Sequence, residues 1–169
     1  MTRDIPSRQG MFSIATLYLQ NGGRIGVCAM PGRFSDLSSD LQTISAWSPS
    51  IVLTLTERVE MDACGSGELG SLLERRGIGW KHLPIRDWGG LSGDNAEVWP
   101  ALSSALHEAL DQGDGVLTHC NGGHGRSGMI ALRLLVERGE DPETALKRLR
   151  HVRPGAVQGQ KQLDWATGG

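Results

Sequence analysis

Residues 115–128 read Gly-Val-Leu-Thr-His-Cys-Asn-Gly-Gly-His-Gly-Arg-Ser-Gly, and this stretch decides the fold of the chain. The apolar run 115–118 predicts a short buried strand, and the apolar positions in 127–136 predict a helix. Cys120 then lies at a turn from strand to helix, six positions before Arg126. Because backbone N–H groups converge at such a turn, the stretch predicts a loop that binds an anion.

The residue types in this loop suit phosphoryl transfer. A helix N-terminus and nearby positive charge stabilise a thiolate, so we expect Cys120 to be a nucleophile. Arg126 offers a planar guanidinium that matches two oxygens of a phosphoryl group. Three glycines let the loop curl so that its N–H groups point inward, namely Gly122, Gly123 and Gly125.

The remaining loop residues complete the predicted phosphate site. The Ser127 hydroxyl is placed to hydrogen-bond the sulfur and to ease its departure from a cysteinyl-phosphate. His119 precedes Cys120 and is expected to order the loop through hydrogen bonds. With Asn121 and His124 in the same loop, we expect a phosphate or sulfate ion to occupy it.

The whole string resembles the Cys-x5-Arg-Ser/Thr signature of the protein tyrosine and dual-specificity phosphatase superfamily. A Walker A loop is excluded because no Lys-Ser/Thr follows the glycines, and rhodanese-like loops hold their arginine closer to the cysteine. A zinc site is disfavoured because no second pair of cysteines stands at ligand spacing. The resemblance implies a cysteinyl-phosphate mechanism that uses no metal ion and no cofactor.

A general acid is expected on a separate loop, where residues 83–90 read Leu-Pro-Ile-Arg-Asp-Trp-Gly-Gly. This stretch is similar to the Pro-Ile-x-Asp acid loop of the dual-specificity branch. The similarity assigns Asp87 as the acid that protonates the leaving oxygen and then as the base that activates water. Asp94 is the alternative, although its place at a predicted helix start also suits a capping carboxylate.

Two further stretches extend the resemblance over about residues 24–166. Residues 153–162 are similar to the Arg-Pro-Gly-x-Val segment of phosphatases of the cell-division-cycle 14 and cyclin-dependent-kinase-associated types, in which a glutamine positions the hydrolytic water. Spacing from Arg153 favours Gln162, with Gln158 and Gln160 as alternatives, and a solvated helix face is the competing interpretation. Residues 26–32 resemble the Gly-x-Cys-x-x-Pro-Gly stretch that opens the kinase-associated type.

Two residues depart from the kinase-associated pattern. His124 stands where that type usually has an apolar residue, and Arg86 replaces a small one. Both departures add positive charge near the predicted site.

Periodicity and turn residues predict the other elements. Strands over 12–19 and 24–28 form a hairpin at 21–23, and further strands cover 51–55 and 80–83. Helices follow Ser35, cover 69–73 up to Gly77, span 95–112 and begin again at 141–142. The alternation predicts an α/β fold with a mainly parallel twisted sheet, helices on both faces, and the site at the carboxyl ends of the strands.

Length and charge limit the other classes. The 169 residues are expected to form one phosphatase domain, with its core at about 12–166 and flexible ends at 1–10 and 167–169. A net charge of −2 gives no basic face for nucleic acid, and no apolar run is long enough to insert into a membrane. Without an apolar leader after Met1 we expect a cytoplasmic protein.

The number of cysteines is odd, and their wide spacing points to a reducing compartment. Cys28 and Cys64 both remain open as partners for Cys120 on oxidation.

Three functions follow from these observations. The leading one is hydrolysis of phosphotyrosine in proteins or peptides, with phosphoserine and phosphothreonine as further candidates. An inositol phosphate or phosphoinositide phosphatase is the alternative, because His124 stands where phosphoinositide phosphatases with a similar signature carry a lysine. A non-catalytic phosphate-recognition module is the third. The sequence does not specify the physiological substrate or the oligomeric state.

Overall fold

A five-stranded sheet forms the centre of the computed structural model, which describes residues 11–168. The strands run in the order β1-β2-β5-β3-β4 and are β1 (Ala15–Tyr18), β2 (Arg24–Cys28), β3 (Pro49–Thr54), β4 (Gly79–His82) and β5 (Gly115–His119). β1 pairs with β2 in an antiparallel hairpin, and all other pairs are parallel. The predicted mainly parallel sheet and the hairpin are confirmed.

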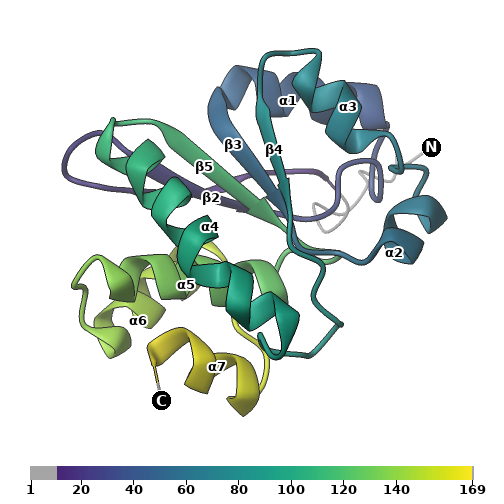
Figure 1. Cartoon of the computed structure of the whole chain (residues 1–169). Helices are drawn as coiled ribbons and strands as arrows, with labels where there is room; N and C mark the ends of the chain where they lie inside the picture. The colour runs from purple at the N-terminus through teal and green to yellow at the C-terminus, as the bar shows by residue number, and fades with distance from the viewer. Residues whose placement is uncertain (1–10, 169) are drawn as a thin grey trace, which may run out of the picture.

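Helices cover both faces of this sheet, as predicted. They are α1 (Leu37–Trp47), α2 (Arg58–Ala63), α3 (Leu69–Glu74), α4 (Asp94–Asp111), α5 (Gly125–Glu137), α6 (Pro142–Val152) and α7 (Gln160–Thr167). Figure 1 shows α1 and α3 on one side of the sheet and α4 to α7 on the other. The central strand β5 is buried along its whole length, so the segment that follows it starts from a rigid support.

Side chains of the central strands alternate between two apolar clusters, because successive residues of a strand point to opposite faces. Leu53 and Val116 belong to the cluster under α4 to α7, and their neighbours Val52 and Leu117 belong to the cluster under α1 and α3. The same division places Cys120 in the first cluster and buried Cys28 in the second.

Local capping fixes the starts of two helices. Asp36 precedes α1, and its carboxylate accepts a hydrogen bond from the Ser39 N–H at 3.0 Å. Asp141 precedes α6 in the same way, accepts from the Thr144 N–H at 3.0 Å, and is followed by Pro142 in the first turn. These arrangements satisfy N–H groups that have no partner within the helix.

Two elements differ from the sequence prediction. β1 is shorter than the predicted strand 12–19, because its pairing with β2 runs only from Ala15 opposite Val27 to Tyr18 opposite Arg24. α2 was not predicted; it begins after the cap residue Glu57, with a capping box closed by Glu60.

The ends of the chain lie largely outside the described residues. The predicted flexible ends, 1–10 and 167–169, fall there apart from Thr167, which ends α7, and Gly168, which caps it. Within residues 11–168, no helix combines the length and the apolar character needed to cross a membrane.

Candidate active site

The signature loop, residues 120–126, leaves the carboxyl end of β5 and leads into α5. Its main chain is held from three directions. The Leu55 N–H donates to the His119 carbonyl at 3.1 Å, and the Met30 N–H donates to the Asn121 carbonyl at 3.1 Å. The Val157 N–H donates to the carbonyl of His124 at 3.0 Å. These bonds hold the loop and its junction with β5 from the segments that follow β2 and β3 and from the segment before α7.

Cys120 is buried at the base of this loop, with 3% of its surface exposed. Its sulfur lies 3.2 Å from the Ser127 hydroxyl. The ring nitrogens of His119 lie 2.7 Å from Thr54 Oγ1 and 3.2 Å from the Cys120 carbonyl. Burial lowers the pKa of His119 to about 4, so at neutral pH this imidazole is uncharged and supports the loop through hydrogen bonds.

Arg126 is held by a residue that the sequence analysis missed. Its Nη1 and Nη2 donate to the two carboxylate oxygens of Glu60 at 2.8 and 2.7 Å, and Nη1 also donates to the Ile85 carbonyl at 3.0 Å. Burial lowers the pKa of Arg126, but the hydrogen bonds to Glu60 and the charges of Cys120, Glu60 and Asp87 together outweigh it and raise that pKa. Glu60 comes from α2. Its position three residues after Glu57 is the one feature of the sequence that singles it out, and that spacing indicates a helix start and not a functional site.

The acid loop, residues 83–93, connects β4 to α4 and faces the signature loop. Asp87 Oδ1 lies 3.6 Å from Arg126 Nη2, and the side chain of Asp87 is 59% exposed. The next residue, Trp88, has a left-handed backbone with φ of +64°, and its N–H donates to Asp87 Oδ1 at 2.9 Å. Asp94 is exposed at the first position of α4. The sequence suggested Asp94 for the cap position of this helix, but Gly93 occupies that position.

A pocket of about 290 Å³ brings these elements together. Signature-loop residues form its base, and Asp87, Trp88, Arg33 and Gln158 form its walls. Asp94 is not among its lining residues. The structure therefore places the cysteine, the arginine and Asp87 around one space.

The three candidate glutamines occupy different positions. Gly125 has no side chain, but a β-carbon added to it would lie 2.8 Å from Gln158 Oε1 and 3.1 Å from Gln162 Oε1. Both glutamine side chains therefore lie against the signature loop. Gln162 is fully buried, and it donates to the Gly89 carbonyl of the acid loop at 3.4 Å. Gln160 is exposed and pairs with Asp164 on its own helix.

Arg153 also supports the loop. Its Nε donates to the Gly123 carbonyl at 2.8 Å and its Nη2 to the Gly122 carbonyl at 3.1 Å. Burial, and secondarily the charge of Arg153, lower the pKa of His124. In the sequence Arg153 marked only the start of a motif, since nothing local shows that it reaches back to the signature loop.

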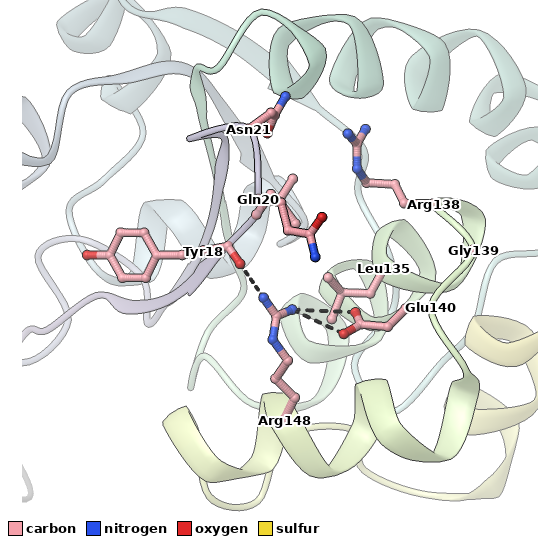
Figure 2. Close-up of a pocket in the computed structure, with 9 residues that line it drawn as sticks. Tyr18, Gln20, Asn21, Leu135, Arg138, Gly139, Glu140 and Arg148 are labelled. Atoms are coloured by element: carbon pink, nitrogen blue, oxygen red, sulfur yellow. Dashed lines mark hydrogen bonds and ion pairs between the residues drawn. The ribbon is translucent and has the colours of Figure 1, made fainter.

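A cavity of about 560 Å³, larger than the catalytic pocket, lies elsewhere. It sits between the β1–β2 turn and the C-terminal end of α5, and Figure 2 shows Tyr18, Arg138 and Arg148 around it. α5 has 13 residues and so separates this cavity from the signature loop by about 20 Å. Size alone does not identify the site.

Comparison with known proteins agrees with this geometry. A family model described as "Polymorphic toxin system, DSP-PTPase phosphatase" matches residues 26–140. Cyclin-dependent kinase inhibitor 3 of Mus musculus is 31% identical over 148 residues, which cover 83% of this chain and 69% of that protein. The Homo sapiens protein is 30% identical over 152 residues with the same coverage.

Solved structures show the same fold. Kinase associated phosphatase, crystallised with a serine in place of its catalytic-site cysteine, gives a TM-score of 0.81 at 26% identity, with 92% of each chain covered. Tk-PTP in its active form gives 0.69 at 28% identity, covering 91% of this chain and 95% of that one. The chain therefore belongs to the DSP-PTPase phosphatase family and is a cysteine-based protein phosphatase that resembles the cyclin-dependent-kinase-associated branch.

Proposed function

We propose that this phosphatase hydrolyses phosphotyrosine, and also phosphoserine and phosphothreonine, through a cysteinyl-phosphate on Cys120. The observation that carries the proposal is the shared pocket, in which Asp87 faces Arg126 across the loop that holds the buried cysteine. The sulfur attacks phosphorus while the bond to the leaving oxygen breaks, and Asp87 gives its proton to that oxygen.

Arg126 and the loop amides would stabilise the phosphoryl oxygens. The Nε of Arg126 is buried and has no hydrogen-bond partner among residues 11–168, whereas Nη1 and Nη2 are engaged by Glu60. This free donor is therefore available for a phosphoryl oxygen. With this positive charge the reaction needs no metal ion, and we expect inorganic phosphate to bind in the same loop.

The second step releases phosphate. A water attacks phosphorus, Asp87 takes a proton from that water, and the sulfur–phosphorus bond breaks with Ser127 donating to the departing sulfur. Gln162 is our candidate for positioning the water, with Gln158 beside it against Gly125. The hydrogen bond from Gln162 to the acid loop supports this assignment.

We place the activity in the cytoplasm. The mechanism requires Cys120 as a thiolate, and all three cysteines are free. A reducing compartment maintains that state.

Hydrolysis of p-nitrophenyl phosphate in chelator and reductant tests the proposal. We expect turnover by the wild type and none by Cys120→Ser. A wild type that binds phosphate without turnover would instead indicate a recognition module.

The acid is tested by a matched pair of variants. On a substrate with a poor leaving group, Asp87→Asn should lower kcat by roughly 10²-fold or more. Asp94→Asn should leave kcat nearly unchanged, because Asp94 lies outside the pocket. The reverse result would assign the acid to Asp94.

A further inference from the structure

A chain of three hydrogen bonds runs from the edge of the sheet to the signature loop. The indole Nε1 of Trp80 donates to Thr54 Oγ1 at 2.8 Å, and that oxygen lies 2.7 Å from His119 Nε2. The other ring nitrogen of this histidine, Nδ1, lies 3.2 Å from the carbonyl oxygen of Cys120. The chain thus crosses the neighbouring strands β4, β3 and β5, which Figure 1 shows side by side, and ends at the residue that carries the proposed nucleophile.

The indole at the start of this chain is held in place. Trp80 is half-buried, and its ring stacks on the imidazole of His82 with 5.3 Å between the ring centres. Helix α3 packs against the same ring at Gly70, where an added β-carbon would lie 2.4 Å from Trp80 Cε3. Because any side chain at Gly70 would displace the ring, this glycine allows the helix to fix the direction in which the indole N–H points.

The donors and acceptors along the chain set the direction of each bond. An indole nitrogen only donates, so Thr54 Oγ1 accepts from Trp80. The single hydrogen of the Thr54 hydroxyl has no acceptor other than His119 Nε2 among the described residues, so Nε2 accepts. The hydrogen of the neutral imidazole is then on Nδ1, which donates to the Cys120 carbonyl. A carbonyl oxygen only accepts, so the far end of the chain gives the same tautomer independently.

Burial makes this tautomer hard to exchange. Thr54 and His119 are both fully buried, so bulk water does not compete for either group. The low pKa of His119, about 4, keeps the imidazole neutral at pH 7. The other neutral tautomer would set the Nδ1 lone pair against the carbonyl oxygen of Cys120 and would leave the Thr54 hydroxyl without an acceptor.

We propose that Trp80 and Thr54 are positioning residues that act through His119. They select its Nδ1–H tautomer, and that tautomer anchors the Cys120 carbonyl. The inference rests on the proposed function, because it assigns these residues a role in holding the loop that binds phosphate. The carbonyl of Cys120 and the N–H of Asn121 belong to one trans peptide group and point in opposite directions. A carbonyl anchored on a buried imidazole thus aims the Asn121 N–H toward the side on which both residues line the catalytic pocket.

The other polar groups of Asn121 explain why this N–H matters. Its carbonyl accepts from the Met30 N–H at 3.1 Å, and its side-chain amide donates to Glu60 Oε1 at 3.3 Å. Its main-chain N–H has no acceptor within residues 11–168. That donor is therefore available for a phosphoryl oxygen, and the tautomer of His119 determines where it points.

NMR of protein with isotope-labelled histidine nitrogens measures the tautomer directly. At pH 7 we expect the wild type to show a protonated Nδ1 and an unprotonated Nε2 for His119, whose signals are assigned by their loss in His119→Gln. Thr54→Val removes the hydroxyl, so the ring should lose this single tautomer. Because the measurement needs no turnover, it is independent of the proposed function.

The value of kcat/KM for p-nitrophenyl phosphate measures the consequence for catalysis. Thr54→Val should lower it about tenfold, and Thr54→Ser should keep it within about twofold because the hydroxyl is retained. Thr118→Val is the matched control. Thr118 is a fully buried residue of the adjacent strand β5, and its hydroxyl has no hydrogen-bond partner within the described part of the chain.

A second pair of variants tests the start of the chain. Trp80→Phe removes the indole donor and should lower kcat/KM roughly threefold, with a mixture of tautomers at His119. Trp47→Phe removes an equivalent bond, from a half-buried indole to Thr16 Oγ1 at 3.0 Å, and should change neither measurement. Circular dichroism and thermal unfolding show which variants keep the fold, and if Thr54→Val does not fold, the tryptophan pair decides.

Each other outcome overturns the inference in a distinct way. A wild-type His119 protonated on Nε2 contradicts the assigned directions, and an unchanged tautomer in Thr54→Val means that the hydroxyl does not select it. A Thr54→Ser enzyme as slow as Thr54→Val, or a control as slow as its partner variant, means that packing and not the hydrogen bond is responsible. If the wild type hydrolyses no phosphate ester, the proposed function has failed, and the NMR spectra still decide the tautomer.

Discussion

The guanidinium of Arg126 is oriented by two groups outside the signature loop, Glu60 and the Ile85 carbonyl. Because Arg126 is only 1% exposed, these bonds fix its plane before a substrate arrives. A guanidinium held in this way needs little reorientation when negative charge develops on the phosphoryl oxygens. Glu60 is therefore a positioning residue that acts through Arg126.

The first prediction concerns this carboxylate. Glu60→Gln keeps the shape of the side chain, but its amide presents a donor to the donors of Arg126, and we expect kcat to fall about tenfold. Steady-state kinetics with an aryl phosphate measures the effect. Replacing exposed Glu74 by glutamine is the control. A Glu60→Gln enzyme within twofold of the wild type would show that Arg126 needs no such partner.

The second prediction separates the glutamines. If Gln162 positions the hydrolytic water, Gln162→Ala should slow the second step, so that a burst of about one p-nitrophenol per enzyme precedes slow turnover. Rapid-mixing kinetics measures the burst. Gln160→Ala should behave like the wild type, since Gln160 is exposed. A burst in Gln158→Ala with none in Gln162→Ala would transfer the role to Gln158.

At the scale of elements, a polar cluster joins α4 to the end of α5. The Glu137 carboxylate accepts hydrogen bonds at 2.9, 2.5, 3.0 and 2.8 Å from Trp99, Ser103, His107 and Arg133. Burial raises the pKa of Glu137, but these bonds outweigh it and lower that pKa to about 2. Since the acid loop leads into α4 and the signature loop into α5, this cluster links the elements that carry both loops.

The third prediction follows from the sign of that shift. The folded pKa of Glu137 lies below its ordinary value of 4.5, so its stabilisation is complete above about pH 4.5 and is lost as the pH falls toward 2. Glu137→Gln should lower the free energy of unfolding by roughly 1–3 kcal/mol at pH 7 and by much less near pH 2. Urea unfolding at several pH values measures this difference.

The control for this prediction is Glu143→Gln, because Glu143 forms only an exposed pair with Lys147. An effect of Glu137→Gln that stayed the same from pH 7 to pH 2 would contradict the assignment.

Elements with local signals could be predicted from the sequence, and α2 could not. The helix that follows Ser35 was predicted from its apolar positions, and the helix at 141–142 from Asp141 and Pro142, which favour a helix start. α2 begins after Glu57, a less usual cap, and its six residues are too few to show a helical period. The contact from Glu60 to Arg126 depends on tertiary structure, which local sequence does not encode.

At the scale of the whole molecule, parallel strands bring distant segments to one edge of the sheet. Arg33 follows β2, Asp87 follows β4 and Cys120 follows β5, and Gln158 joins them from the segment before α7. The sequence predicted that the site lies at this edge, because the carboxyl ends of parallel strands meet on the same side of the sheet. It did not predict the convergence of Arg33 on the signature loop, which depends on how the turn after β2 folds.

The fourth prediction concerns the stability of the whole fold toward acid. Burial lowers the pKa of His119 from 6.5 to about 4, so the unfolded chain takes up a proton between these values and the folded chain does not. The contribution of neutral His119 to the free energy of unfolding is therefore complete above about pH 6.5 and is lost as the pH drops toward 4. We expect this residue alone to account for a loss of about 3 kcal/mol over that window.

The free energy of unfolding, measured at several pH values between 7 and 4, gives its slope against pH and so checks this prediction. His119→Gln should flatten it, whereas a glutamine at exposed His151 should leave it unchanged. A His119→Gln protein with the slope of the wild type would show that another group titrates.

The exposed indole of Trp88 gives the molecule an optical reporter of its own. Trp88 is 64% exposed beside Asp87, while the other four tryptophans, at 47, 80, 99 and 165, are buried or half-buried. Fluorescence that is quenched by added iodide should therefore come mainly from this one side chain. Because Trp88 lines the catalytic pocket, phosphate binding should shield it, so that occupancy can be followed by light without any label.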